Sequence, residues 1–249
     1  MATHLVTLFD MNYSARALAL YESAKKHVPG CQFWFLYLDT GSKKLIEELK
    51  LERVRGFTVE ELHNPELETV RKGRTQGEFA FTAKSNFLRY LVESDSVKEN
   101  DAVIWADADI LFYSSAQHLV QEVIPQHSII VTPHKFPTGM EHMDDMVGKY
   151  NAGMIFFHID DSSKKCIREW AAQCIEWCFH RLEDGKLGDQ MYLNDWHKKY
   201  GGVYDLPDKG VNAGTWNILN YSMGRSGPGS FALDGEPIDE LFAALASQP

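Results

Sequence analysis

Residues 102–112 read AVIWADADILF, in which a short apolar run is followed by two alternating acids and a second apolar run. The first run predicts a strand buried on both faces, as in parallel sheets covered by helices. In extended backbone, residues i and i+2 point to the same side, so Asp107 and Asp109 can face one cation. Mg²⁺ and Mn²⁺ take oxygen ligands from one or two carboxylates and complete their shell with substrate phosphates. The stretch therefore indicates a metal site, with a solvated turn as the alternative interpretation.

Apolar runs that read as buried strands alternate with segments of helical period along the rest of the chain. We predict strands at residues 4–9, 32–38, 53–58, 102–106, 128–132 and 153–158. We predict helices from Ser14 onward and at residues 43–50, 82–94, 163–182 and 190–200, with a polar, flexible stretch at 73–78 and loops with short strands over 200–249. This order predicts an α/β fold with a mostly parallel sheet and helices on both faces, which binds ligands at the carboxyl ends of its strands.

Composition limits the classes of function. The 249 residues carry a net charge of −10, and 44% of them are hydrophobic. This apolar content excludes wholesale disorder, and the acidic charge argues against a nucleic acid as the main partner, because phosphate binding needs clustered Lys and Arg. No apolar run reaches the roughly 18 residues of a membrane span, and residues 1–4 do not open a secretory signal. We therefore expect a cytoplasmic protein without a membrane span.

The cysteines are consistent with a reducing compartment. Cys174 and Cys178 are four residues apart, and with His180 they raise the alternative of a zinc site. A structural zinc ion usually draws two close pairs of ligands, and a second pair is missing. We interpret these two residues, together with Cys31 and Cys166, as buried reduced thiols.

Three short motifs, in a fixed order, carry a resemblance to a known family. The first motif, WADAD (105–109), lies where a predicted strand ends. The second, YNAGM (150–154), lies where a strand begins, and the third, GDQ (188–190), lies where a helix begins. Together with VTLF (6–9) and Lys84, they resemble the retaining, Asp-x-Asp-containing branch of the GT-A fold nucleotide-sugar glycosyltransferases, over roughly residues 4–220. The resemblance implies a single Rossmann-like GT-A domain over 1–249, with a nucleotide-binding half at about 1–112 and an acceptor-side half at about 113–249.

The implied activity is metal-dependent transfer of a sugar from a nucleotide diphosphate, with a UDP-type donor favoured, to a glycan or glycolipid acceptor, as in polysaccharide biosynthesis. A Mn²⁺ or Mg²⁺ ion on Asp107 and Asp109 would neutralise the departing diphosphate, and Lys84 would add a second positive contact. Residues at the end of the first strand would hold the base and ribose: Thr7, Phe9 and Asp10.

The remaining implied roles concern the two sugars. Asn151 would hydrogen-bond hydroxyls of the donor sugar, and Gly153 would permit its close approach. By resemblance, Asp189 would hold the donor sugar and Gln190 would lie under its anomeric carbon, which makes these two the candidate catalytic residues. Trp216 and Asn217 are candidate acceptor contacts, because sugar rings stack on aromatic faces.

The chain departs from the family in one respect, because no histidine follows His197, whereas the family usually supplies a late histidine to the metal. The metal would then have two protein ligands with diphosphate and water, or be completed by His197 or an unidentified acid, or the domain would be cut from a longer protein. A catalytically degenerate sugar-nucleotide-binding domain of a larger protein is therefore the alternative function. Phosphatases of the haloacid dehalogenase type fit less well, because their acid pair lies near the N-terminus with Thr or Val after it, whereas here Ile110 follows. Nucleotidyltransferases fit less well, because residues 10–13 are not the Gly-rich, basic loop that they carry after the first strand.

Overall fold

The structure is a computed structural model that describes residues 1–208, 210–227, 230–233, 236–237 and 242–244. Its centre is a seven-stranded sheet with the order β3-β2-β1-β4-β7-β6-β8. Its strands are β1 (Thr3–Phe9), β2 (Gln32–Tyr37), β3 (Val54–Thr58), β4 (Ala102–Ala106), β6 (Ile129–Pro133), β7 (Tyr150–His158) and β8 (Val203–Asp205). Within this sheet β7 runs antiparallel to both neighbours, and the other pairs are parallel. The predicted mostly parallel α/β sheet is confirmed.

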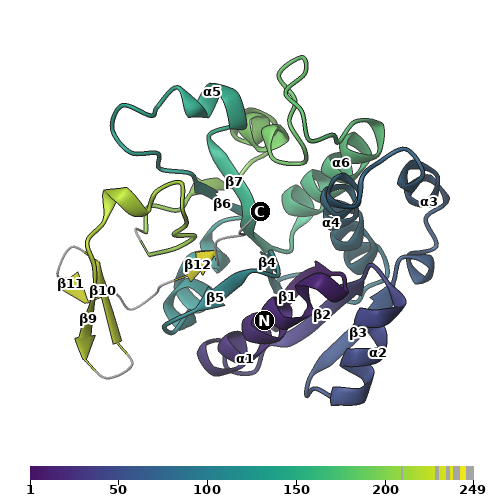
Figure 1. The fold of residues 1–249 in the computed structure, drawn as a ribbon, viewed down its shortest axis with the longest axis horizontal. Coiled ribbons are helices and arrows are strands. Elements are labelled where there is room, and N and C mark those ends of the chain that lie inside the picture. The colour runs from purple at the N-terminus through teal and green to yellow at the C-terminus, as the bar shows by residue number, and fades with distance from the viewer. Residues whose placement is uncertain (209, 228–229, 234–235, 238–241, 245–249) are drawn as a thin grey trace.

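Helices cover both faces of the sheet (Figure 1). They are α1 (Ser14–His27), α2 (Thr40–Leu49), α3 (Pro65–Arg71), α4 (Gln76–Glu93), α5 (Met143–Val147), α6 (Asp161–Glu176) and α7 (Trp196–Lys199). Successive residues of β4 point to opposite faces, as the pleat requires. Trp105 lies in one core with Phe87 of α4 and Trp170 of α6, whereas Ile104 lies in a second core with Tyr21 of α1.

Smaller elements surround this frame. Short helical turns lie at η1 (Met11–Tyr13), η2 (Glu60–Leu62), η3 (Leu119–Val123), η4 (Ile124–Gln126), η5 (Met191–Asp195) and η6 (Ile218–Asn220). The strand that follows the two acids, β5 (Ile110–Phe112), pairs antiparallel with β12 (Phe242–Ala244), which comes from the far end of the chain. A three-stranded antiparallel sheet contains β9 (Met223–Gly227), β10 (Ser230–Leu233) and β11 (Glu236–Pro237).

The structure corrects several expected boundaries. The stretch expected to be flexible at 73–78 is the start of α4, because the Thr75 hydroxyl accepts from the backbone N–H of Glu78 while the Glu78 carboxylate accepts from that of Thr75. The helix expected at 163–182 ends at Glu176, and Trp177 is extended. The helix expected at 190–200 divides into η5 and α7. The capping box decided the first of these boundaries, which hydrophobic period alone does not encode.

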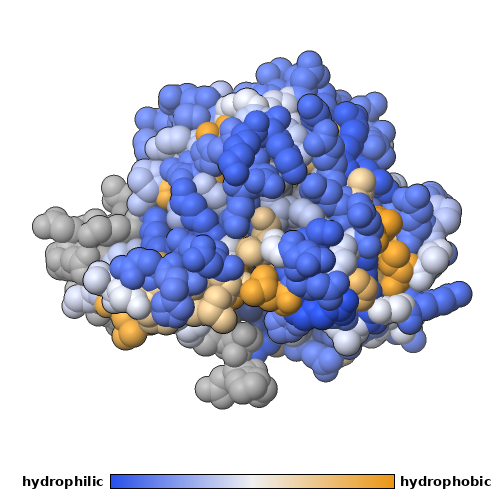
Figure 2. Space-filling view, turned by 90° about the horizontal axis from the view of Figure 1, so that it is seen from above, coloured by the Kyte–Doolittle hydropathy of each residue, from blue (hydrophilic) through white to orange (hydrophobic). Residues whose placement is uncertain are grey.

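The surface agrees with the composition. Figure 2 shows a mostly hydrophilic face on which apolar residues form scattered patches. Among the described helices, none is long and apolar enough to cross a membrane. All four cysteines are buried, as predicted.

Candidate active site

The predicted motifs meet at one edge of the sheet. Asp107 follows the carboxyl end of β4, and Asn151 to Gly153 open β7. Because β7 runs antiparallel to β4, its first residues lie beside the last residues of β4. The Asp107 N–H donates to the Gly153 carbonyl oxygen at 2.8 Å, which extends the β-ladder into the motif. The topology thus brings together two motifs that are more than forty residues apart in the sequence.

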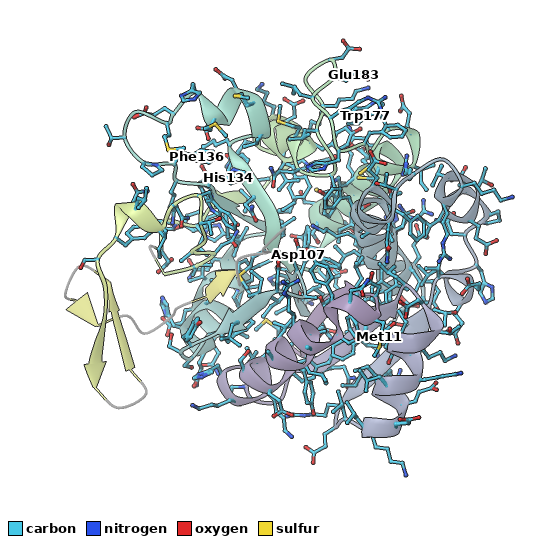
Figure 3. All side chains as sticks on the ribbon, in the orientation of Figure 1. Met11, Asp107, His134, Phe136, Trp177 and Glu183 are labelled. Carbon is cyan, nitrogen blue, oxygen red and sulfur yellow. The ribbon has the colours of Figure 1, made fainter. Side chains whose placement is uncertain are left out.

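Asp107 lies near the middle of the molecule (Figure 3). Its Oδ1 accepts from Trp105 Nε1 at 2.8 Å and lies 3.0 Å from Lys84 Nζ, and its side chain is 37% exposed. Two residues on, Asp109 is half-buried. Burial, and then repulsion by Asp107, raise the pKa of Asp109 to about 6. The two carboxylates therefore repel each other at the edge of the sheet where a cation was predicted.

Lys84 of α4 is buried at the junction of the predicted motifs. Its Nζ lies 3.0 Å from Asp107 Oδ1, 2.9 Å from Asp189 Oδ2 and 3.0 Å from the Ala152 carbonyl oxygen. Burial alone would lower the pKa of Lys84, but the attraction of Asp107 and Asp189 holds it above its usual value. An ammonium has three hydrogens. Two carboxylates and one carbonyl oxygen therefore surround the Lys84 ammonium, which also lines the two compartments described below.

Asp189 and Gln190 lie in the turn between Gly188 and η5. Asp189 is 4% exposed, and its own burial keeps its pKa raised despite the opposing charge of Lys84. The Gln190 Oε1 accepts from the Ala152 N–H at 3.2 Å, and its Nε2 donates to the Val147 carbonyl at 2.7 Å. These two bonds hold the Gln190 carboxamide in one orientation against the start of β7.

The Asn-x-Gly spacing has a steric reason. The Asn151 side chain folds back along the chain, so that its Oδ1 accepts from the Gly153 N–H at 2.8 Å. A Cβ at Gly153 would lie 2.7 Å from that oxygen and 3.4 Å from Asp107 Oδ2. Contacts under 3.0 Å are essentially never made by real Cβ atoms. A side chain at this position would therefore displace the Asn151 amide from its bond to the Gly153 N–H, whereas the distance to Asp107 is an ordinary contact.

Two compartments open on either side of this cluster. The larger, about 510 Å³, is lined by residues from the end of β1, the start of α4 and the Asp-x-Asp turn, among them Asp10, Tyr13 and Asp109. The smaller, about 140 Å³, is lined by residues 151–153 of the YNAGM motif, by residues 188–190 of the GDQ motif and by His180. Three residues line both of them: Phe81, Lys84 and Asp107.

Of the three residues predicted at the end of β1, Phe9 and Asp10 line the larger compartment and Thr7 does not. The Phe9 ring is 1% exposed and packs edge-on against Phe35 and Tyr37. Thr7 is fully buried, and its hydroxyl has no hydrogen-bond partner among the described residues. Asp10 caps η1 by accepting from the Tyr13 N–H. Tyr13, which sequence reasoning missed, is 37% exposed and supplies an accessible aromatic face in this compartment.

The predicted acceptor residues lie in a loop that packs on the segment following β6. Trp216 is half-buried and meets the His134 ring edge-on at a centroid distance of 6.0 Å. Asn217 is 1% exposed, and its amide bonds the Gly214 N–H and the His134 carbonyl. Neither residue lines the two compartments described above.

A divalent cation fits the donor set in charge and chemistry. Asp107, Asp109 and Asp189 oppose the single ammonium of Lys84, which leaves two negative charges when all three acids are ionised. The donor atoms offered by Asp107 and Asp109 are hard carboxylate oxygens, which suit Mg²⁺ or Mn²⁺. Among the described residues, no group of three or more His, Cys, Asp or Glu side chains is placed to hold a metal ion. His197 pairs with Asp205 at 2.6 Å and lines neither compartment.

The sheet topology and this edge-of-sheet site define a GT-A glycosyltransferase. Residues 4–208 match the family described as Glycosyl transferase family 8. The chain belongs to that family and is a glycosyltransferase.

Similar proteins cover most of the chain. An uncharacterised protein of Bacillus subtilis (strain 168), YfnF, is 26% identical over 243 residues, which are 96% of this chain and 80% of that protein. The galactosyltransferase LgtC, solved with donor and acceptor sugar analogues, superposes with a TM-score of 0.60 at 17% identity, covering 87% of this chain and 77% of LgtC. Mouse xyloside xylosyltransferase 1 superposes with a TM-score of 0.55 at 15% identity, covering 88% of this chain and 90% of the xylosyltransferase chain. These two structures establish the likeness in fold.

Proposed function

We propose that the protein uses Mn²⁺ or Mg²⁺ to transfer a sugar from a nucleotide diphosphate, with a UDP-type donor favoured, to a glycan or lipid-linked acceptor, with retention of configuration. The observation that carries the proposal is the cluster of Lys84, Asp107 and Asp189 between two compartments of unequal size. A nucleotide sugar has the same plan, because a diphosphate separates a large nucleoside from a smaller sugar. The buried thiols support a reducing compartment such as the cytoplasm.

The larger compartment suits the nucleoside. Its volume of about 510 Å³ and the exposed face of Tyr13 support a stacked base there. Asp10 and the backbone at the end of β1 would meet the ribose, and the buried Thr7 and Phe9 would support that wall from behind.

Asp107 and Asp109 would hold the cation between the compartments. When bound, the ion would neutralise the charge that develops on the departing diphosphate. Lys84 would hold Asp107 and Asp189 in place and add a second positive charge beside the diphosphate, since it lines both compartments.

The smaller compartment suits the donor sugar. Asp189 and Asn151 would bond its hydroxyls, and the glycine at 153 leaves space beside them. Gln190 is held on both sides, so its carboxamide oxygen keeps one lone pair for the region of the anomeric carbon. His180 lies exposed at the rim of this compartment and would meet the acceptor, with Trp216 and Asn217 shaping the neighbouring loop.

Thermal unfolding with nucleotides tests the proposal. UDP, GDP and dTDP are each added with and without Mn²⁺, and we expect UDP to raise Tm only when the metal is present. Asp109→Asn should remove this shift. The matched control Asp95→Asn, at an exposed residue of positive φ that suits asparagine, should keep it. No metal-dependent shift with any nucleotide would contradict the proposal. Binding without turnover of any UDP-sugar would instead favour the degenerate binding domain.

A further inference from the structure

His134, the residue after β6, is a buried histidine to which the proposed reaction gives no role. It is 4% exposed, and its ring stacks on Phe136 at a centroid distance of 4.9 Å. Figure 3 shows the two side by side on the segment between β6 and α5. The His134 N–H donates to the Lys149 carbonyl, and its own carbonyl accepts from Asn217. Contacts from three separate segments thus hold the imidazole in one place.

The hydrogen bonds of His134 determine its tautomer. Nδ1 lies 2.8 Å from the Gly148 carbonyl oxygen. That oxygen can only accept, so Nδ1 carries the hydrogen and Nε2 carries a lone pair. Nε2 faces Asn151 Nδ2 at 3.3 Å. Burial lowers the pKa of His134 to about 4, which keeps the ring neutral and the lone pair available near pH 7.

The amide of Asn151 is almost fully used within the protein. Its Oδ1 accepts from the Gly153 N–H at 2.8 Å and from Asn212 Nδ2 at 3.0 Å. The backbone N–H of Gly153 can only donate, so the oxygen must face Gly153 and the NH₂ must face His134. Two accepted bonds occupy the oxygen, and His134 takes one of the two amide hydrogens. Among the residues that the structure describes, the second amide hydrogen of Asn151 has no partner, and Asn151 lines the smaller compartment.

We propose that His134 is a positioning residue for sugar transfer, which with Asn212 aims the second amide hydrogen of Asn151 at a hydroxyl of the donor sugar. This inference rests on the proposed function, because it gives Asn151 a sugar to bind. Asn212 is suited to its part, since it is fully buried at a positive φ of 56° and its Nδ2 also bonds Thr132 Oγ1. Nucleotide binding lies in the other compartment and does not depend on this network.

Two substitutions at His134 test whether the hydrogen-bond acceptor at Nε2 matters, or only the volume of the side chain. His134→Gln places a carboxamide oxygen near the position of Nε2, whereas His134→Asn reaches only the position of Nδ1. Calorimetry at saturating Mn²⁺ measures Kd for UDP and for whichever of UDP-glucose, UDP-galactose and UDP-N-acetylglucosamine the wild type binds most tightly. We expect His134→Asn to weaken binding of the UDP-sugar about ten-fold, as for loss of one hydrogen bond, with UDP binding within about two-fold. His134→Gln should restore most of the loss.

Further variants test whether His134 and Asn212 act by positioning Asn151 rather than by stabilising the fold. Asn212→Gly suits the positive φ and removes the second hold on Asn151, so it should give the same sugar-specific loss. In an Asn151→Ala background, His134→Asn should cause no further loss, because its effect passes through Asn151. A His134→Asn or Asn212→Gly protein that binds the UDP-sugar like the wild type overturns this inference alone. A wild type that binds no nucleotide overturns the proposed function and this inference with it.

Discussion

The Nζ of Lys84 lies 2.9 Å from Oδ2 of Asp189, and the side chains of both residues are no more than 5% exposed. Lys84 belongs to α4, and Asp189 belongs to the turn before η5, more than a hundred residues later. The same ammonium contacts Asp107 at 3.0 Å. One buried cation therefore joins the strand end that carries the predicted metal ligands to the turn that carries the predicted sugar ligands.

Removing the Lys84 ammonium should lower the stability of the folded protein. Lys84→Met leaves the buried Asp189 carboxylate without a counter-charge, and we expect the free energy of unfolding to fall by about 3–5 kcal/mol. Urea unfolding measures the change. Lys198→Met is the matched control, because the Lys198 side chain is 81% exposed and should change stability by less than about 0.5 kcal/mol. A loss no larger for Lys84→Met than for the control would show that the pair is not a stabilising element.

The raised pKa of Asp109 predicts a pH-dependent stability of the metal-free protein. The folded pKa of about 6 exceeds the ordinary value of 3.8, so between these values the folded state holds a proton that the unfolded state has lost. Stability contributed by this group is present below about pH 4 and is lost as pH rises to 6. Asp109→Asn should therefore stabilise the metal-free protein at pH 7 by about 1–3 kcal/mol and by almost nothing at pH 4. Urea unfolding of both proteins at the two pH values measures this, and an equal difference at each would contradict it.

Glycine at 153 should be indispensable for steric reasons. Gly153→Ala places a Cβ 2.7 Å from Asn151 Oδ1. We expect this overpacking to cost about 1–3 kcal/mol and to weaken UDP-sugar binding more than UDP binding. Gly201→Ala is the control, because Gly201 is exposed and lines neither compartment, and a Cβ there meets nothing within 4 Å, so stability should change by no more than about 1 kcal/mol. Calorimetry and urea unfolding distinguish the two, and equal effects at both sites would refute the steric argument.

The cysteines should be inert in the folded protein. Burial raises the pKa of Cys31 to about 12 and that of Cys166 and Cys174 well above the ordinary value. A thiol reacts as its thiolate. We expect Ellman's reagent to modify none of the four at pH 8 until urea unfolds the chain, and then to modify all of them. Rapid reaction of any cysteine under native conditions would show that its segment opens locally.

Local chemistry made much of the frame predictable. The apolar run at 102–106 is buried at every position in β4, and the acids follow it at the sheet edge. The order of strands and helices predicted the layers, because buried strands and amphipathic helices have different periods. The boundary at 75–78 was missed because a capping box, rather than periodicity, starts α4 there. The boundary at 176 was missed because the backbone becomes extended at Trp177 while the helical pattern of the sequence continues.

The sequence predicted most residues of the site, but not their contacts with one another or their exposure. The sequence offers Lys84 as a cation that could meet a phosphate, and only the fold shows it buried between Asp107 and Asp189. It offers Phe9 as an aromatic face, whereas the fold buries Phe9 and exposes Tyr13. Such differences arise because exposure depends on neighbours that are remote in the chain.

By itself the sequence determined the fold class and the three motifs, because strand period, Asp-x-Asp spacing and Asn-x-Gly spacing act within a few residues. Tertiary structure alone decided which groups remain free. The antiparallel course of β7 brings Asn151 to the edge where β4 ends. The loop at 212–217 places Asn212 against the Asn151 side chain and Asn217 against the His134 carbonyl. Among the described residues, the hydrogen bonds made there leave one amide hydrogen of the Asn151 side chain without a partner, because partners remote in the sequence take the other positions.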